Sequence, residues 1–320
     1  MSRVQVVGAG AWGTALAIQA ARAGNVVRLC ARDPERAAAI VSARENPRLP
    51  GVRLPDGIAV SHGPEPSELT LLAVPTQQLR AASARLPGAG VLVCGAKGVE
   101  AGSNALPLEI LAETRPGEPA AVLTGPNFAG EVARGLPAGA TVAARQREVR
   151  ERVTLALATP AFRLYGNDDP VGAQVGGAAK NVIGIAAGAV IGAGWGENAR
   201  AGLVTRGLAE LMRLARALGG RAETVAGLSG LGDLMLTCAG PTSRNYDFGL
   251  ALGRGASVAD ALAARAGVVE GVATAQALVA RARASGIELP ICEVVAALLA
   301  GAITLTGAMT ALLSRPLRDE

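Results

Sequence analysis

The chain has 320 residues, half of them hydrophobic, and this length accommodates two domains of ordinary size. Aromatic residues make up only 2% of the chain, so the core must be filled mainly by alanine, valine, leucine and isoleucine. The formal net charge is +5, but the arginines are spread among acidic residues without basic runs or interleaved aromatics, which argues against nucleic-acid binding. The charge instead favours small anionic ligands such as phosphates.

Up to about residue 165, short β-branched runs alternate with helical stretches. Their nearly continuous apolar character predicts strands of a parallel sheet that is covered on both faces by helices. This alternation predicts an N-terminal Rossmann domain with a doubly wound sheet. The expected strands are residues 3–7, 26–30, 70–74, 91–94, 120–123 and 141–144.

The second half of the chain is predicted to be all-helical, which makes the whole chain an α/β protein with a helical C-terminal domain. Residues 162–172 are rich in turn formers and are interpreted as a linker, so the predicted domains are 1–170, which binds a dinucleotide, and 171–320, which binds the substrate.

The segment 171–195 is apolar enough for a membrane span, but it contains Lys180, and a charge near the middle of a span is costly. A buried helix is therefore preferred. The expected helices are 173–192, 199–218, 257–266, 271–285 and 290–301.

The cysteines Cys30, Cys94, Cys238 and Cys292 lie far apart and form no C-x-x-C pair, so we expect free thiols in a reducing compartment. A strand pattern begins within the first few residues and leaves no room for a targeting peptide, which predicts a cytoplasmic location. No group of histidine, cysteine and acidic residues has the spacing of metal ligands, so no metal site is predicted.

The first expected strand leads into the stretch GAGAWG, in which Gly8, Gly10 and Gly13 form the pattern G-x-G-x-x-G. In dinucleotide-binding proteins the first glycine permits a tight turn, the second lets the backbone approach a pyrophosphate, and the third lets the helix pack close to the strand. The pyrophosphate binds at the positive N-terminal end of that helix. A glycine-rich turn without a ligand is the alternative for this motif.

The second expected strand ends in CARDP, at the position that separates NAD from NADP in such domains. Arg32 at the strand tip can hold a 2′-phosphate through two hydrogen bonds, which favours NADP. Asp33 follows directly and leaves NAD open. A surface arginine without a ligand is the alternative.

Three further segments follow expected strands: AVPTQ, CGAKG and LTGPNFAGE. The carboxyl ends of the strands form the binding crevice in an open α/β sheet. We therefore expect Lys97, the Gly125 amide and Asn127 to lie at this edge.

The second half carries another set of polar residues. Asp233 lies in the apolar, glycine-rich stretch GLSGLGDLMLTC, where an acid needs a partner. Ser243, Arg244 and Asn245 form a compact set of donors suited to a phosphate ester, with a polar loop or helix cap as the alternative. Glu270, in VVEGVATA, could be only an acid at the start of a helix.

Only Lys97 and Lys180 are lysines among the 31 basic residues. Reduction of a carbonyl requires a proton on its oxygen, and arginine cannot supply one because its pKa exceeds about 12. A lysine can do so if apolar surroundings lower its pKa towards about 7–8. The stretch GGAAKNVIGIAAG gives Lys180 such surroundings, so we predict Lys180 to be a largely uncharged general acid and base. The only histidine, His62, lies outside every motif.

These motifs, together with GPNFAGEVARGLP, SRNYDFG and VVEGV, resemble those of the bacterial NAD(P)-dependent glycerol-3-phosphate dehydrogenases over nearly the whole chain. The resemblance implies a homodimer that reduces dihydroxyacetone phosphate to sn-glycerol 3-phosphate, a phospholipid precursor. It implies that Lys180 is the general acid and base, and we expect Asp233 to orient either Lys180 or the substrate hydroxyls. The implied substrate contacts are Lys97, Gly125, Asn127, Lys180, Asp233, Ser243, Arg244 and Asn245. The implied contacts with NADPH, or with NADH, are Gly8, Gly10, Ala11, Trp12, Gly13, Arg32, Lys97, Ala129, Arg244, Val268 and Glu270.

Two positions depart from the family pattern. Asn127 stands where the family usually has serine or threonine, which leaves its substrate contact open, and Ala11 replaces a frequent serine in the first loop. The alternative enzyme is another lysine-dependent dehydrogenase, of the β-hydroxyacid or ketopantoate reductase type, which would grip a carboxylate. The donors at 243–245 argue against that alternative. A cofactor-binding sensor without turnover is the alternative outside enzymes, and the two lysines argue against it.

Overall fold

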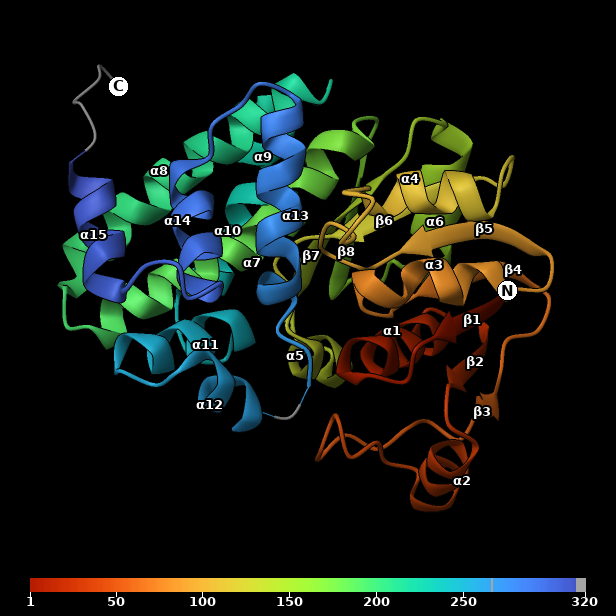
Figure 1. Ribbon diagram of the computed structural model, residues 1–320. Coiled ribbons are helices and arrows are strands. Elements are labelled where there is room, and N and C mark those ends of the chain that lie inside the picture. The colour runs from red at the N-terminus through yellow and green to blue at the C-terminus, as the bar shows by residue number, and fades with distance from the viewer. Residues whose placement is uncertain (266, 315–320) are drawn as a thin grey trace. The chain divides into compact units, whose positions relative to one another are not determined.

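The computed structural model describes residues 1–265 and 267–314, and these divide into two compact units. The first unit comprises Met1–Lys97 and Leu106–Gln174. The second comprises Gly98–Ala105 and the described residues from Val175 onward. Figure 1 shows the strands and helices along the chain.

The first unit is built on one eight-stranded sheet with the order β3-β2-β1-β4-β5-β6-β7-β8. Neighbouring strands are parallel except for β6 and β7, which are antiparallel. The order from β3 to β6 is that of a doubly wound dinucleotide-binding sheet, with the switch point between β1 and β4. The predicted Rossmann fold is therefore confirmed. The strands are β1 (Arg3–Val7), β2 (Val26–Ala31), β3 (Ile58–His62), β4 (Ser67–Leu72), β5 (Ala89–Cys94), β6 (Ala120–Thr124), β7 (Ala138–Ala143) and β8 (Phe162–Asn167).

The central strands are buried on both faces, as their continuous apolar runs predict. Val6 of β1 pairs with Leu29 of β2 and Leu71 of β4, and all three belong to a core that α1 covers. Helix α1 packs against α5 and α6, while α3 and α4 pack against each other (Figure 1). The helices of the first unit up to β8 are α1 (Ala11–Arg22), α2 (Pro34–Ala43), α3 (Thr76–Ala84), α4 (Pro107–Thr114), α5 (Ala129–Arg134) and α6 (Arg147–Leu157).

The prediction missed two strands, and both lie at the edges of the sheet. Phe162–Asn167 was interpreted as part of a linker, but it forms β8, which pairs with β7 in parallel. Most of β8 is not buried, and β3 at the opposite edge is likewise only partly buried. Edge strands lack the continuous apolar pattern of central strands, so their sequences resemble those of turns and loops.

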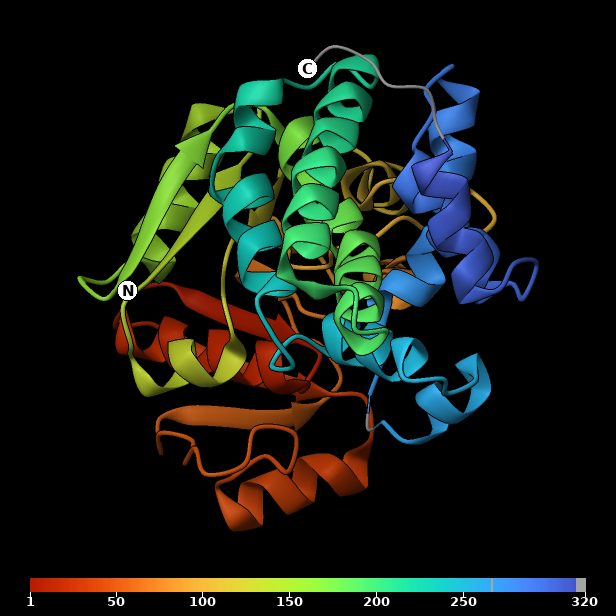
Figure 2. The same cartoon turned by 90° about the vertical axis from the view of Figure 1, so that its left-hand side faces the viewer.

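The second unit contains no strand among its described residues, and Figure 2 shows its helices in green to blue. The helical C-terminal domain is thus confirmed, with each expected helix present to within a few residues. Ala266, the last residue of the expected helix 257–266, lies outside the described residues. The helices are α7 (Pro170–Gly192), α8 (Gly196–Ala217), α9 (Ala222–Ala226), α10 (Asp233–Cys238), α11 (Arg244–Gly253), α12 (Val258–Ala263), α13 (Glu270–Ala284), α14 (Pro290–Leu299) and α15 (Leu305–Leu313).

Helix α7 is long and apolar enough to cross a membrane, but 89% of its most apolar 18-residue window is buried inside the protein. Such burial is typical of a core helix. It agrees with the interpretation of residues 171–195 as a buried helix.

Glycines allow α7 and α11 to approach closely. A Cβ atom at Gly188 of α7 would lie 2.0 Å from the carbonyl oxygen of Tyr246 in α11. A Cβ atom at Gly249 of α11 would lie 1.9 Å from the carbonyl oxygen of Ile185 in α7. A larger residue at either position would force the helices apart, so this glycine contact holds the beginning of α11 beside α7.

A buried carboxyl group joins α8 to α14. Glu210 of α8 is 3% exposed, and it accepts hydrogen bonds from the backbone amides of Ile291 at 2.7 Å and Cys292 at 3.4 Å. Burial raises the pKa of Glu210 to about 7, although these hydrogen bonds lower it in part. The folded protein therefore binds this proton more tightly than the unfolded chain does.

We expect Glu210→Gln to reduce the pH dependence of the free energy of unfolding. In the wild type, the stabilisation linked to this proton is fully present below the unfolded-state pKa of 4.5 and is lost as the pH rises through about 7. Glutamine stays neutral, and its single amide oxygen can accept the shorter of the two hydrogen bonds, the one from the Ile291 amide, but not both. Denaturant titrations at several pH values should show a smaller decline between about pH 5 and pH 7 in the variant. An unchanged decline, equal to that of the exposed control Glu197→Gln, would contradict this prediction.

Candidate active site

The loop between β1 and α1 has the geometry that a dinucleotide phosphate requires. Gly8 has a φ of +110°, and a Cβ atom there would lie 2.6 Å from the carbonyl oxygen of Ala73. A Cβ atom at Gly13 would lie 1.9 Å from the carbonyl oxygen of Gly8, so α1 packs directly on the loop. At Gly10 a Cβ atom would meet nothing within 4 Å, which leaves this backbone open to a ligand. The loop thus has the three properties that this motif requires: a tight turn at Gly8, close helix packing at Gly13 and a backbone open to a ligand at Gly10.

The first turn of α1 offers free donors. Gly10 is the N-cap residue and has no side chain to cap the helix, so the backbone amides of Ala11, Trp12 and Gly13 lack a side-chain acceptor. These amides lie at the positive end of the helix dipole, which favours an anion. The Trp12 indole packs against Gly95, and its Nε1 is buried with no hydrogen-bond partner in the described structure. This unpaired donor also fits a polar ligand group.

Arg32 and Asp33 differ in how the fold uses them. Arg32 follows β2 directly and is exposed, and its guanidinium has no hydrogen bond or ion pair within residues 1–265 and 267–314. Asp33 is the N-cap of α2, and its Oδ1 accepts the backbone amide of Glu35 at 3.0 Å. A free guanidinium beside a carboxylate that is already engaged favours a phosphate at this strand end.

Lys97 and Gly125 meet at the carboxyl ends of β5 and β6, where Lys97 Nζ donates to the Gly125 carbonyl oxygen at 3.0 Å. Asn127 donates from Nδ2 to the carbonyl oxygen of Gly139 at 3.1 Å. Its Oδ1 is buried with no hydrogen-bond partner in the described structure. A buried acceptor of this kind fits a hydroxyl group of a ligand. Ala129, at the start of α5, lies two residues further on.

In the second unit, the amine of Lys180 on α7 has two polar partners on α10. Lys180 Nζ donates to Asp233 Oδ1 at 2.5 Å and to Thr237 Oγ1 at 2.9 Å. The Lys180 side chain is 12% exposed and that of Asp233 is 1% exposed. The surroundings of this amine are therefore not purely apolar as expected, because a buried carboxylate and a hydroxyl contact it.

Thr237 was not among the predicted site residues. It stands four residues after Asp233, so the two side chains lie on the same face of α10 and reach the same amine. The next residue, Cys238, is buried, and burial raises the pKa of its thiol to about 12, although Lys180 and Arg200 lower it in part. The thiol therefore stays protonated at neutral pH and does not compete with Lys180 as an acid–base group.

Ser243 and Arg244 stand at the beginning of α11. Ser243 is the N-cap, and its hydroxyl accepts the Tyr246 amide at 3.4 Å. Arg244 is exposed and forms no hydrogen bond or ion pair with the described residues. Its Nη1 lies 2.9 Å from where a Cβ atom of Gly267 would stand, which places the guanidinium beside the chain that leads into α13. Arg244 thus keeps its donors free for an anionic group.

Asn245 ties α11 to two other elements. Its Nδ2 donates to Asn181 Oδ1 at 2.8 Å, and its Oδ1 accepts the Gly271 amide at 3.0 Å. Asn181 follows Lys180 on α7, and Gly271 follows Glu270 at the start of α13. One hydrogen of the Asn245 amide group is left for a ligand. Val268, just before α13, is 39% exposed.

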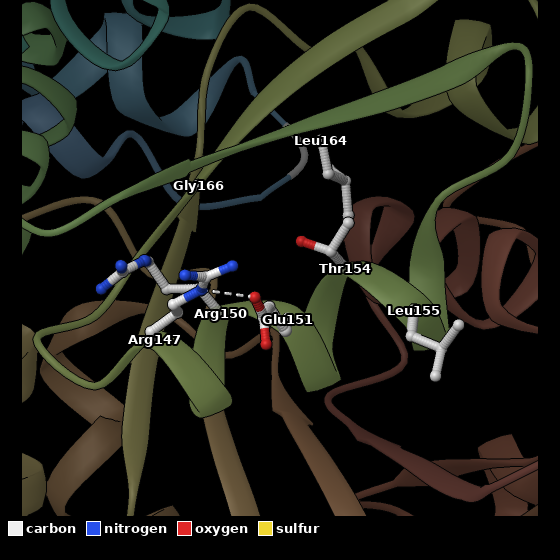
Figure 3. Close-up of a pocket in the computed structure, with 7 residues that line it drawn as sticks. All are labelled: Arg147, Arg150, Glu151, Thr154, Leu155, Leu164 and Gly166. Atoms are coloured by element: carbon white, nitrogen blue, oxygen red, sulfur yellow. Dashed lines mark hydrogen bonds and ion pairs between the residues drawn. The ribbon is translucent and has the colours of Figure 1, made fainter.

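Figure 3 shows a pocket elsewhere in the first unit, on α6 and β8. Two of its cations are already engaged, because Arg147 pairs with Glu151 at 2.6 Å and Arg150 donates to the Ala144 carbonyl at 2.6 Å. None of the predicted site residues lines it. It is therefore not the candidate active site.

Two family models cover most of the chain. The N-terminal model of the NAD-dependent glycerol-3-phosphate dehydrogenases matches residues 3–150, and the C-terminal model matches residues 169–310. The chain belongs to this family. Glycerol-3-phosphate dehydrogenases of the NAD(P)+ type from Acidiphilium cryptum and Caulobacter vibrioides are 59% and 53% identical, over 98% and 99% of this chain and 97% and 98% of their own lengths.

A solved structure agrees with this assignment. Glycerol-3-phosphate dehydrogenase from Coxiella burnetii has a TM-score of 0.93 to this dehydrogenase at 33% identity, and the match covers 98% of this chain and 99% of that one. Family membership confirms the resemblance and the enzyme class, an NAD(P)-dependent oxidoreductase. It supports neither the β-hydroxyacid nor the ketopantoate alternative.

Proposed function

We propose that this dehydrogenase reduces dihydroxyacetone phosphate to sn-glycerol 3-phosphate with NADPH or NADH, reversibly, and thereby supplies glycerophospholipid synthesis. The observation that carries the proposal is the amine of Lys180, held by Asp233 and Thr237. The proposed functional boundary is near residue 170, with most of the proposed cofactor contacts in residues 1–170 and the acid–base group in residues 171–320.

The nicotinamide cofactor, when bound, supplies the hydride that reaches the carbonyl carbon. The uncapped amides at the start of α1 and the open backbone at Gly10 fit its pyrophosphate. Arg32 fits a 2′-phosphate, which favours NADPH. The other residues proposed to hold the cofactor are Gly8, Ala11, Trp12, Gly13, Lys97, Ala129, Arg244, Val268 and Glu270.

Lys180 protonates the alkoxide oxygen that reduction creates. The Asp233 carboxylate stabilises the ammonium form, which is the form that a general acid requires. In the reverse direction the neutral amine takes the proton from the alcohol. Asp233 and Thr237 fix the direction of the amine, which keeps it aligned with the reacting oxygen.

The substrate phosphate is proposed to bind at the beginning of α11 through Ser243, Arg244 and Asn245. Binding there, away from the reacting carbonyl, orients the ketone for the chemical step. Lys97, the Gly125 amide and the unpaired Asn127 Oδ1 are proposed to contact the hydroxyl and carbonyl oxygens.

The enzyme is proposed to act in the cytoplasm as a homodimer. The four cysteines are free and buried, which supports a reducing compartment. The dimer rests on the family resemblance alone, and analytical ultracentrifugation would measure the mass in solution.

Substrate choice tests the proposed function. NADPH oxidation is measured with equal concentrations of dihydroxyacetone phosphate, ketopantoate and succinic semialdehyde. Turnover with dihydroxyacetone phosphate alone is expected, because the free donors at 243–245 suit a phosphate ester. Turnover only with a carboxylate substrate would overturn the proposal.

We expect Arg32→Ala to raise the KM for NADPH by about 10- to 100-fold, the range for losing a charge-assisted hydrogen-bonded pair, and to change the KM for NADH little. Steady-state kinetics with both cofactors measure the difference. Arg28→Ala is a matched control on the same strand, because Arg28 pairs with Glu65 at 2.8 Å, and neither KM should change. Equal effects of Arg32→Ala on both cofactors would remove the 2′-phosphate assignment.

A further inference from the structure

A buried amide lies behind the glycine-rich loop and has no role in the mechanism above. Asn46, in the segment between α2 and β3, is completely buried. Its Nδ2 donates to the carbonyl oxygen of Ala9 at 3.1 Å and to Thr14 Oγ1 at 2.7 Å. Its Oδ1 accepts from Arg36 Nη2 at 3.1 Å and from the backbone amide of Arg48 at 3.1 Å. Two donors and two acceptor positions of this side chain are thus satisfied.

Three of the four partners lie in other parts of the first unit, and the fourth, Arg48, is two residues further along the same segment. Ala9 is the middle residue of the loop, Thr14 lies in the first turns of α1, and Arg36 lies on α2. Arg36 Nη2 also donates to the Ala9 carbonyl oxygen, at 2.9 Å. A buried polar network that is fully satisfied favours one geometry over others. Asn46 therefore fixes the loop to the start of α1 and to α2.

This anchoring sets the direction of one peptide group. Two donors hold the Ala9 carbonyl oxygen on the side of Asn46 and Arg36. In a trans peptide the next amide points the opposite way, so the N–H of Gly10 is directed away from Asn46. A Cβ atom at Gly10 would meet nothing within 4 Å, so the backbone there is open. Without the anchor, the flanking glycines would allow the peptide to rotate and to present its carbonyl oxygen to an anion.

We propose that Asn46 is a positioning residue for the pyrophosphate of the cofactor. It holds the Ala9–Gly10 peptide so that the Gly10 N–H and the amides at the start of α1 face the ligand before binding. Ordering this loop in advance removes a cost that binding would otherwise carry. The inference rests on the proposed use of this loop for NADPH or NADH.

The test compares Asn46→Ala and Asn46→Asp with the wild-type chain. Both variants lose the donors to Ala9 and Thr14, and the aspartate also places a negative charge behind the loop. The Kd for NADPH and for NADH, from fluorescence titration, should rise by about tenfold or more. Both cofactors should be affected alike because they share the pyrophosphate, in contrast to Arg32→Ala. At saturating cofactor, kcat and the KM for dihydroxyacetone phosphate should stay within about twofold of wild type.

A second readout uses the protein without cofactor. Hydrogen–deuterium exchange of a peptide covering residues 8–14 should be faster in Asn46→Ala. The matched control is Gln19→Ala in the same helix, because Gln19 is 1% exposed and donates to the Leu157 carbonyl at 2.8 Å and to Thr159 at 3.1 Å. That control should lower the melting temperature without changing either Kd.

If an Asn46 variant does not fold, Thr14→Val keeps the side-chain shape and removes one partner of the amide. It should raise the Kd for both cofactors by a few-fold. Unchanged Kd values in a folded Asn46 or Thr14 variant would overturn the inference. A wild-type chain that binds neither cofactor would instead overturn the proposed function.

Discussion

Lys180→Ala should lower kcat for the reduction of dihydroxyacetone phosphate by about 10²–10⁴-fold, the usual contribution of a positioned general acid. Hydride transfer leaves an alkoxide, and the variant has no amine to protonate it. The Kd for NADPH should change little, because the residues proposed to bind its pyrophosphate lie in the loop after β1 and at the start of α1. Steady-state kinetics at saturating cofactor and a fluorescence titration measure the two effects.

Lys180→Arg separates proton transfer from charge. Arginine can still pair with Asp233, but it does not release a proton at neutral pH. Its kcat should therefore fall nearly as far as that of the alanine variant. A small primary amine added to the assay should partly restore kcat in Lys180→Ala, where space is open, and not in Lys180→Arg. Values of kcat within a few-fold of wild type in both variants would show that Lys180 is not the acid–base group.

The sequence predicted the features of the fold that depend on local patterns. The turn at Gly8 and the contact of Gly13 with Gly8 lie within six residues of each other, so the motif alone implies them. The central strands and the long helix α7 carry nearly continuous apolar runs, whereas the long helix α8 mixes apolar with charged residues over a length typical of a helix. Edge strand β8 was missed because it ends in Gly166 and Asn167 and runs directly into the turn-forming residues that follow it.

Contacts between distant residues could not be predicted in the same way. Lys180 and Asp233 are 53 positions apart, and only the packing of α7 and α10 shows that the amine has a carboxylate partner. Asn46 precedes a proline, a pattern that indicates a turn, and nothing nearby in the sequence reveals its bonds to Ala9 and Thr14. Likewise, the N-cap role of Asp33 became evident only when the start of α2 was known.

The largest effect on stability is expected from Asp233→Asn. The wild-type carboxylate is 1% exposed and lies 2.5 Å from the Lys180 amine. Asparagine keeps the shape and an amide oxygen that can accept from Lys180, but not the charge, so a buried ammonium would keep neutral hydrogen-bond acceptors without a compensating carboxylate. Removing one member of a buried ion pair typically costs about 3–5 kcal/mol. The amine can avoid part of this cost by losing its proton, but it then has no proton to donate, so kcat for reduction should also fall.

Thr237→Val is the matched control, because it removes a neutral hydrogen bond to the same amine and keeps the side-chain shape. That change should lower the free energy of unfolding by only about 0.5–1.5 kcal/mol. Denaturant titrations and kcat measurements on both variants provide the comparison. If Asp233→Asn lowers stability and kcat no more than Thr237→Val does, the carboxylate does not stabilise the ammonium, and the role of Asp233 in the proton transfer is wrong. A larger loss in both measurements would show that the charge of Asp233, and not merely a hydrogen bond, keeps Lys180 in the form that donates the proton.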